Sequence, residues 1–493
     1  MTDRLRPQLK VLTDDRIGAV IDDALRILED VGVAVEHTEA VELLAGAGAK
    51  ISDDGTRVHI PADLCQQCVA SAPSEFSLYD RDGNNPITIG GETTHFDPGS
   101  AALTLYDYER GEIRDPDTKD VVDFAVLTDR ISAYDCQSTG VIPADVPAAL
   151  ADRFRLLISL IYGKKPVITG TFSHDGFETM HALLCAVRGG HDDLAKKPLA
   201  LFDCCPTAPL SWSELTCDAL ISCARNGIPA EIVSMPLTGA TAPVTLAGAI
   251  VQHAAENLSG IVIHQLAGKG SPVVFGGAPS CFDMRKATTP MGSVETMLID
   301  ASYAHVGKKL GLPVHTYLGL SDAKLPDYQA GFETAMGVVV AALAGVNVVS
   351  GPGMLNFVGT QSLEKLVLDG EICAMAKRLI DGVDFSDSSA AIDVIRRHAD
   401  DKSFLTDDHT RANFRKEVYF PSDVIDRGSQ GDWESTGRLD SLARAHAKIP
   451  ELIEAEPIEV PDAQLVDELE SIVLADARAL GVDTLPDWRT FLP

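Results

Sequence analysis

The segment LPVHTYLGLSDAKLPDYQAGFETAMGVVVAALAG, residues 312–345, contains an apolar stretch, a polar loop and a second apolar stretch, in that order. Residues 312–319 have the composition of a buried strand, and residues 328–345 have the spacing of a helix. His315, Tyr317, Ser321, Asp322 and Lys324 all lie at or just after the end of the strand. We interpret this concentration of polar groups at the end of a buried strand as one corner of an active site.

The same strand-then-helix order occurs eight times between residue 94 and residue 382. The predicted strands are short and apolar on both faces, and proline or glycine precedes several of them. Strands of this kind are buried on both sides, which is typical of a parallel sheet covered by helices. The eight predicted strands are 94–106, 136–143, 166–172, 198–207, 228–236, 272–279, 312–319 and 346–355.

Eight parallel β/α units predict a TIM (β/α)8 barrel of the α/β class. A doubly wound open sheet is the alternative, although no GxGxxG motif follows a strand. We expect an α+β N-terminal module at 1–92, the barrel at 93–383 and a helical C-terminal tail at 384–493. The tail is expected to wrap the barrel or an adjoining subunit, so the sequence favours a homo-oligomer. Strand 94–106 is the weakest prediction because it contains Pro98 and Gly99.

The bulk composition excludes several classes of protein. The 493 residues carry a net charge of −31, which disfavours nucleic-acid binding because that needs a basic face. The apolar run at 337–355 is interrupted by glycines and a proline, which disfavours a membrane span. The N-terminus lacks the apolar core of a secretory signal, so the sequence predicts a cytoplasmic protein whose ten cysteines are free thiols.

A TIM barrel carries its active site at the carboxyl ends of its strands, so the strand ends predict what surrounds the pocket. Cys65 and Cys68 form a lone CxxC on a predicted helix, which is weak evidence for zinc. The strand ends supply aromatic, carboxylate and imidazole groups, and they contain no tight His/Glu/His spacing for a metal. The residues at these ends are His95, Phe96, Asp97, Phe172, Ser173, His174, Asp203, Cys204, Cys205, Met235, Ser280, Asp283, Arg285, His315, Tyr317, Asn356 and Phe357.

Several segments in the same order resemble the trimethylamine methyltransferase superfamily. They are ALRILEDVGVAVEHTEAVELLAGAGAKI near the start, GGAPSCFDMRKATTPMGSVE, LGLSDAKLPDYQAGFE, SLEKLVLDGEI and FLTDDHTRANFRKEVYFPSDVIDR. The resemblance implies a TIM-barrel enzyme that moves a methyl group from a methylated amine to the Co(I) corrinoid of a partner protein. Founding members use pyrrolysine, whereas ordinary residues stand here. The sequence therefore resembles the non-pyrrolysine members, for which glycine betaine is the leading substrate.

This resemblance suggests roles for the strand-end residues. An aromatic cage of Phe96, Phe172, Tyr317 and Phe357 would bind the quaternary ammonium group through cation–π contacts. His315, His95 or Arg285 would bind the betaine carboxylate. Glycines at the strand ends would let the corrinoid approach the backbone, and the candidates are Gly276, Gly277, Gly351 and Gly353. No residue is assigned to acid–base or nucleophilic catalysis, or to a metal.

Other interpretations remain open on the sequence alone. His315 could be a core histidine, Phe96 and Phe172 could be core aromatics, and Asp322 with Lys324 could be a loop ion pair. The chain could also be a barrel methyltransferase that uses folate, or zinc bound by Cys204 or Cys205. A betaine-binding protein without catalysis is the alternative from another class.

Overall fold

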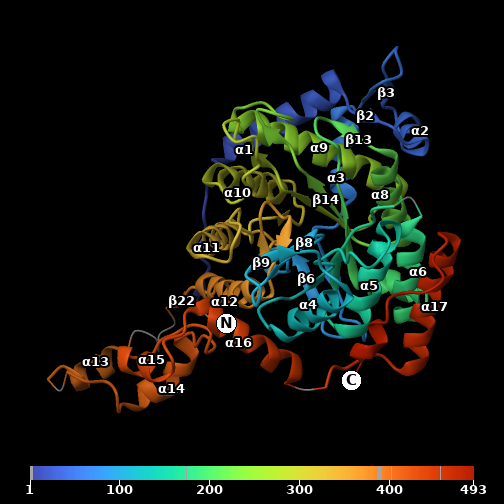
Figure 1. Cartoon of the computed structure of the whole chain (residues 1–493). Helices are drawn as coiled ribbons and strands as arrows, with labels where there is room; N and C mark the ends of the chain where they lie inside the picture. Colours follow the sequence, from blue (N-terminus) through green and yellow to red (C-terminus); the bar gives the residue numbers. More distant parts are fainter. Residues whose placement is uncertain (1–3, 174, 386–390, 401, 456, 493) are drawn as a thin grey trace.

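The central feature of the structure, a computed structural model, is a set of eight short parallel strands, each followed by a helix (Figure 1). The structure describes residues 4–492 except 174, 386–390, 401 and 456. The predicted alternation of strand and helix in an α/β fold is confirmed. The strands are β7 (His95–Phe96), β10 (Gln137–Ser138), β11 (Val167–Thr169), β12 (Ala200–Cys204), β14 (Ala230–Ser234), β16 (Val273–Gly277), β18 (His315–Thr316) and β19 (Val348–Val349).

The eight strands form two parallel sheets whose order follows the chain. One sheet has the order β10-β11-β12-β14-β16 and the other the order β18-β19-β7. A bridge between Phe275 and Val314 connects β16 with the residue before β18. On the other side, the amide of Asp135, just before β10, donates to the carbonyl of Phe96 at 2.8 Å. The order is that of a (β/α)8 barrel, although the described ladders do not run continuously through all eight strands.

Eight helices cover the strands, and six of them begin at a side-chain cap. An Asp, Ser or Thr at the N-cap accepts a backbone N–H of the first turn in every one of these six, which satisfies an otherwise unpaired donor. The short α7 (His191–Lys196) is additional. The eight helices are α4 (Thr118–Arg130), α5 (Ala151–Tyr162), α6 (Gly176–Arg188), α8 (Glu214–Asn226), α9 (Leu246–Ala267), α10 (Val294–Lys309), α11 (Tyr328–Leu343) and α12 (Leu363–Ile380).

The N-terminal ninety residues form the expected mixture of helices and short strands, and they share the core of the strands and helices that follow. The main core cluster runs from Ile17 to Trp488 without a break between the two parts. The short β2 (Ala34–Val35) pairs with β13 (Ser211–Trp212). The other elements are β1 (Arg4–Leu5), α1 (Asp14–Arg26), a π-helix (Ile27–Val31), α2 (Thr38–Gly46), β3 (Lys50–Ile51), β4 (Val58–His59), α3 (Ala62–Ser71), β5 (Glu75–Leu78) and β6 (Ile87–Gly90).

The hairpin of β5 and β6 packs against the interior of the strand assembly. Leu78 and Ile89 form one buried cluster with apolar side chains from five of the parallel strands or the residues beside them. Those side chains are Cys136, Ile168, Leu201, Val274 and Val348. These positions lie toward the amino ends of their strands, so the hairpin fills that end. The carboxyl ends are left for a site.

Two helices of the C-terminal segment lie against the helical layer. Helix α16 (Ser441–Glu454) lies against α12 and α4, and α17 (Ala463–Ala479) lies against α6 and α5 (Figure 1). Trp488 is buried, and its carbonyl accepts the hydroxyl of Tyr162 at 2.8 Å. Between β22 (Val383–Asp384) and α16, an arm projects from the rest of the chain, with α13 (Ile392–His398), α14 (Asp408–Glu417) and α15 (Gln430–Ser435).

All eight parallel strands are shorter than predicted, and two of the predicted ranges are interrupted. The prediction of one strand over 94–106 is wrong, because β7 ends at Phe96 and the next strand, β8 (Thr104–Asp107), pairs with β9 (Glu112–Arg114). Pro98 lacks an N–H for a ladder, which explains the break. Likewise 346–355 divides into β19 and β20 (Met354–Leu355), and Gly351 between them has a φ of 122°. Strand β20 pairs antiparallel with β21 (Thr360–Gln361).

The sequence disfavoured a membrane span at 337–355, and the helices of the structure can be compared with that prediction. Among the described residues, no helix combines the length and the apolar composition that a bilayer crossing requires.

Candidate active site

An apolar cavity of about 260 Å³ lies at the carboxyl ends of the parallel strands. Residues at or after the ends of seven of the eight strands line it, and α8 and the segment before α10 add three more. The lining residues are Ser100, Ala101, Gly170, Thr171, Phe172, Asp203, Cys205, Leu215, Thr216, Val233, Met235, Ala278, Met291, Tyr317 and Val358. An apolar pocket with a few polar groups at this end of the strands is the usual form of a small-molecule site.

Two of the predicted aromatic residues line this cavity. Tyr317 is only 8% exposed, and its hydroxyl is 2.9 Å from the Ser100 hydroxyl, which fixes the ring. Phe172 is 57% exposed, so its ring is accessible from solvent. The side chains of Met235 and Met291 extend the apolar lining. The cavity therefore presents aromatic and thioether groups rather than a continuous charged surface.

His315 lies below this lining, two residues earlier on the same strand. It is fully buried, and its Nε2 is 3.0 Å from the hydroxyl of Ser350. The Ser350 hydroxyl is also 2.8 Å from a carboxylate oxygen of Asp97. On the other side, His315 Nδ1 is 3.4 Å from Oε1 of Glu231. Burial lowers the pKa of His315 to about 3, so the imidazole is neutral at physiological pH.

Asp203 brings a carboxylate to the cavity wall. Burial raises its pKa to about 6, and the neighbouring Glu231 and Arg155 act against that rise. Its Oδ1 is buried and has no hydrogen-bond partner among the described residues. Burial and the nearby Asp203 raise the pKa of Glu231 well above its usual value, so the ionised form of Glu231 is disfavoured beside Asp203. Above pH 6, Asp203 is the ionised member of this pair.

Arg155 is a buried cation near the cavity that the sequence did not identify. It comes from α5 and is fully buried, and its Nη1 donates to the carbonyl of Thr139 at 2.6 Å. Its guanidinium carbon lies 5.2 Å from the centre of the Phe172 ring. The Nη2 atom has no hydrogen-bond partner among the described residues. The rule that places active-site residues at strand ends does not identify Arg155, because Arg155 lies in a helix.

Three predicted ligand residues lie away from the cavity lining. Phe96 is fully buried in the core, where Lys377 Nζ is 5.8 Å from its ring centre. His95 bonds the carbonyl of Thr88 at 2.9 Å, on the hairpin at the other end of the strands. The Arg285 side chain is 87% exposed and pairs with Asp283 at 2.7 Å.

The remaining predicted positions fall on the loops around the cavity. Phe357 is half-buried, and the Lys324 ammonium lies 3.6 Å from its ring centre, while its neighbour Val358 lines the cavity. The Asp322 carboxylate accepts the backbone N–H groups of Met291 and Gly292, both at 2.9 Å. It therefore connects loops and does not form the expected pair with Lys324. His174 lies outside the described residues.

The four glycines that were expected to face a corrinoid are packed against the chain itself. A Cβ at Gly276 would lie 3.0 Å from His315, and one at Gly277 would collide with His253. At Gly351 the neighbour is Gly319, and at Gly353 it is Gln361. These glycines permit close packing within the protein, so their geometry gives no support to a cofactor role.

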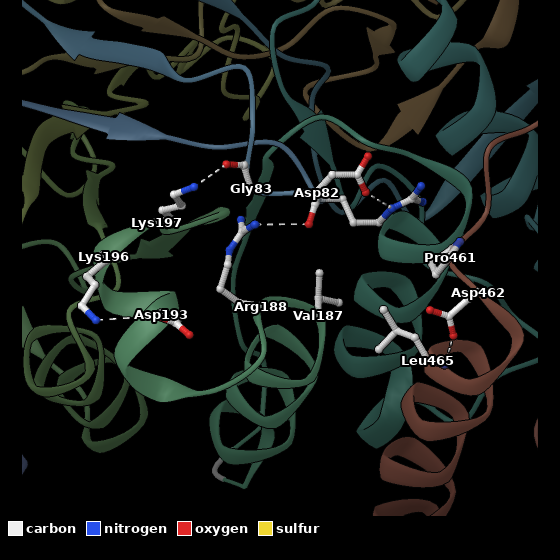
Figure 2. Close-up of a pocket in the computed structure, with 11 residues that line it drawn as sticks. Asp82, Gly83, Val187, Arg188, Asp193, Lys196, Lys197, Pro461, Asp462 and Leu465 are labelled. Carbon is white, nitrogen blue, oxygen red and sulfur yellow. Dashed lines mark hydrogen bonds and ion pairs between the residues drawn. The ribbon is translucent and has the colours of Figure 1, made fainter.

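A second cavity, of about 530 Å³, lies at the opposite end of the strands (Figure 2). It is bounded by the ends of α6 and α17, and by Lys197, which precedes β12. Its cations are already engaged: Arg188 Nη1 donates to the carbonyl of Arg81 at 3.2 Å, and Lys197 Nζ donates to that of Gly83 at 2.9 Å. Lys196 lies 3.6 Å from the carboxylate of Asp193. Because the amino ends of the strands face it, we assign it no part in catalysis.

Comparison with known proteins identifies a class of methyltransferase. The structure is similar to the crystal structure of the Methanosarcina barkeri monomethylamine methyltransferase, with a TM-score of 0.52, 11% identity and coverage of 92% of this chain and 89% of that one. Residues 1–478 match the model of the trimethylamine methyltransferase (MTTB) family. The chain belongs to this family and is a methyltransferase.

Three curated relatives are named for two different substrates, trimethylamine and glycine betaine. A trimethylamine methyltransferase of Methanosarcina barkeri is 33% identical over 478 residues, which cover 94% of this chain and 95% of the relative. One of Desulfitobacterium hafniense (strain DSM 10664 / DCB-2) is 31% identical, with coverage of 95% and 94%. The glycine betaine methyltransferase of Desulfitobacterium hafniense (strain Y51) is 29% identical, with coverage of 97% and 99%.

Proposed function

We propose that this protein takes a methyl group from a quaternary amine, with glycine betaine as the leading substrate, and passes it to the Co(I) corrinoid of a partner protein. The architecture that we propose for it is a closed (β/α)8 barrel. The single observation that carries the substrate class is the apolar cavity with an unpartnered Asp203 oxygen and the rings of Tyr317 and Phe172. A methylated cation combines an apolar surface with a positive charge, and this lining matches both properties.

The reaction requires binding and orientation more than acid–base chemistry. A quaternary ammonium is already a positively charged leaving group, so a nucleophile can displace the amine from a methyl carbon without prior protonation. The Co(I) of the partner supplies that nucleophile in the family that the sequence resembles. The cavity's own residues would hold the substrate cation, exclude water and keep one methyl group toward the opening.

A betaine carboxylate needs a donor, and Arg155 is better placed than the residues that the sequence suggested. Its Nη2 is buried and unpartnered among the described residues, and it lies beside Phe172 of the cavity wall. Guanidinium groups form charge-assisted hydrogen bonds with carboxylates. Arg285 is exposed and already paired, and His95 lies at the other end of the strand assembly. We therefore propose Arg155 as the carboxylate donor, with His315 as a positioning residue beneath Tyr317.

The partner protein would dock over the carboxyl ends of the strands. Large apolar side chains are exposed on loops that follow five of the strands, and such groups suit a protein contact. They are Leu103, Phe172, Met235, Val244, Met284 and Leu325. The negative charge of −31 predicts that electrostatic attraction does not drive docking of an acidic partner.

The zinc-dependent alternative has less support in the donor set. Cys205 lines the cavity and Cys204 is buried beside it. Among the described residues, neither belongs to a group of three or more close His, Cys, Asp or Glu ligand atoms.

The proposal is tested by incubating the purified protein with Co(I) cobalamin and one methylated amine at a time, while methylcobalamin is followed by its absorption. We expect cobalamin to be methylated with glycine betaine as the donor, and more slowly in Tyr317→Ala when glycine betaine is not saturating. Tyr328→Ala is the matched control, because Tyr328 is 87% exposed and lies outside the cavity. Methylation by trimethylamine alone would overturn the quaternary-amine assignment. Tight betaine binding without methyl transfer would favour the betaine-binding alternative.

A further inference from the structure

A cluster of two histidines and a cysteine lies on the outer helical layer, away from the cavity lining. His181 and Cys185 are one turn apart on α6, and His191 is the first residue of α7. The Nε2 of His181 is 3.3 Å from the Cys185 sulfur and 3.5 Å from Nδ1 of His191. All three potential ligand atoms lie within 4.8 Å of one another. Among the described residues this is the one group of three such donors that close together.

These separations are close to those between the ligands of a tetrahedral zinc ion. With Zn–N near ~2.0 Å and Zn–S near ~2.3 Å, tetrahedral angles place two nitrogens about 3.3 Å apart and a nitrogen and a sulfur about 3.5 Å apart. In the cluster the nitrogen–sulfur separation is 3.3 Å and the nitrogen–nitrogen separation is 3.5 Å, so each lies within about 0.2 Å of the corresponding edge of such a site. A modest rotation of the exposed His191 side chain would set the third edge.

The surroundings hold the ligands in place and favour a cation. The ring of Phe177 stacks on His181, with an interplanar angle of 16° and a centroid separation of 6.0 Å. Glu178, which follows Phe177 on α6, carries a negative charge that acts on His181. A negative charge beside the cluster favours a bound cation.

The short connection between α6 and α7 would let one metal ion bind side chains from both helices. Gly189 and Gly190 connect α6 to α7, and their φ values of 88° and 139° lie in the region that favours glycine. Helix α7 has only six residues, and Leu194 is its one buried side chain. A metal bound by side chains on both sides of this turn would fix the position of α7.

We propose that His181, Cys185 and His191 form a Zn²⁺ site that joins α6 to α7, with water in the fourth position. His181 and Cys185 are half-buried and His191 is exposed, so a metal ion can enter from solvent. The mixed nitrogen and sulfur donor set suits Zn²⁺ rather than Mg²⁺ or Ca²⁺, which prefer oxygen. The site joins two helices of the outer layer, and it takes no part in the methyl transfer proposed above.

The first experiment measures metal on the full-length protein. After dialysis against Zn²⁺ and gel filtration, we expect about one zinc per chain by elemental analysis. Replacement by Co²⁺ should give the thiolate-to-cobalt charge-transfer band in the near ultraviolet and the visible bands of tetrahedral Co²⁺. Cys185→Ser and His191→Ala should each lose the metal and the bands. Retention of the metal by both variants would overturn the site, as would its absence from the wild type.

Two controls separate this site from other thiols and from the proposed enzyme. Cys281→Ser removes another half-exposed cysteine and should retain the metal. Cys205→Ser tests the cavity: loss of the metal in that variant, with retention in Cys185→Ser, would place zinc in the cavity and overturn the proposal. His191 is exposed, so His191→Ala should fold even if Cys185→Ser does not. The experiment measures bound metal, so its result does not depend on whether the protein transfers methyl groups.

Discussion

At the scale of single residues, the ionisation of Asp203 should control binding of a cation. Burial raises its pKa from 3.8 to about 6, so the ionised form is less favourable in the folded protein than in the unfolded chain. This effect on folding is absent below pH 4 and complete above pH 6, and it makes the protein less stable as the pH rises through that window. A bound cation would favour the ionised form.

The affinity for glycine betaine should therefore rise between pH 5 and about pH 6 and then become constant. In Asp203→Asn this pH dependence should disappear, and the affinity at pH 8 should fall about tenfold, which corresponds to ~1.4 kcal/mol. Titration calorimetry at several pH values measures both effects. An unchanged pH profile in the variant would show that another group, such as Glu231, controls binding.

Tyr317 should contribute through its ring more than through its hydroxyl. Tyr317→Ala should weaken betaine binding by about 0.5–2 kcal/mol, the usual range for a cation–π contact. Tyr317→Phe keeps the ring and loses only the bond to Ser100, so its affinity should stay close to that of the wild type. Equal losses in the two variants would indicate that the hydroxyl, rather than the ring, binds the substrate.

Arg155 should determine the preference for substrates with a carboxylate. Arg155→Lys keeps a cation but loses the fork of the guanidinium, so binding of glycine betaine should weaken more than binding of choline. The ratio of the two dissociation constants, measured by calorimetry, gives the effect, which we expect to be about tenfold. Equal weakening of both ligands would make Arg155 a structural residue beneath Phe172.

At the scale of elements, the β5–β6 hairpin acts as a plug at the amino ends of the strands. Leu78 is fully buried against side chains of the parallel strands, so Leu78→Ala should leave a cavity and lower the free energy of unfolding by about 2–5 kcal/mol. Betaine affinity should be unchanged, because the active-site cavity lies at the carboxyl ends. Urea denaturation measures the stability, and Leu5→Ala, at an 82% exposed position, is the control. A loss of affinity without loss of stability would contradict this division.

The elements also show where a pattern in the sequence stops being informative. The helices and strands of the β/α units were predicted because hydrophobic periodicity and capping residues act locally. The break after Phe96 follows from Pro98, which is a local feature of the sequence. The break at Gly351 depends on a contact between segments far apart in sequence, because the Gly319 backbone occupies the space that a side chain at 351 would need. Local propensity does not contain that contact.

At the scale of the whole molecule, the projecting arm bears large apolar side chains that are exposed in the described part of the chain. Leu405 is 86% exposed and Ile392 is 63% exposed. Phe414 and Phe420 are each about half exposed. Such a surface suits a subunit contact, in line with the expected homo-oligomer. Light scattering after gel filtration should show an oligomer, and Leu405→Asp with Phe414→Asp should raise its dissociation constant about tenfold or more. A wild-type monomer at micromolar concentration would contradict this expectation.

The sequence by itself determined the order of strands and helices, the carboxyl-end location of the site, and Tyr317, Phe172, Asp203 and Met235 as residues near it. These follow from periodicity and from the geometry of parallel strands, which are local or general rules. Only the tertiary structure decided that Phe96 faces the core, that Arg285 faces solvent, that Arg155 reaches the cavity region from a helix, and that His181, Cys185 and His191 meet. The direction of a side chain at the end of a strand depends on register and on what packs against it, and no short stretch of sequence specifies either.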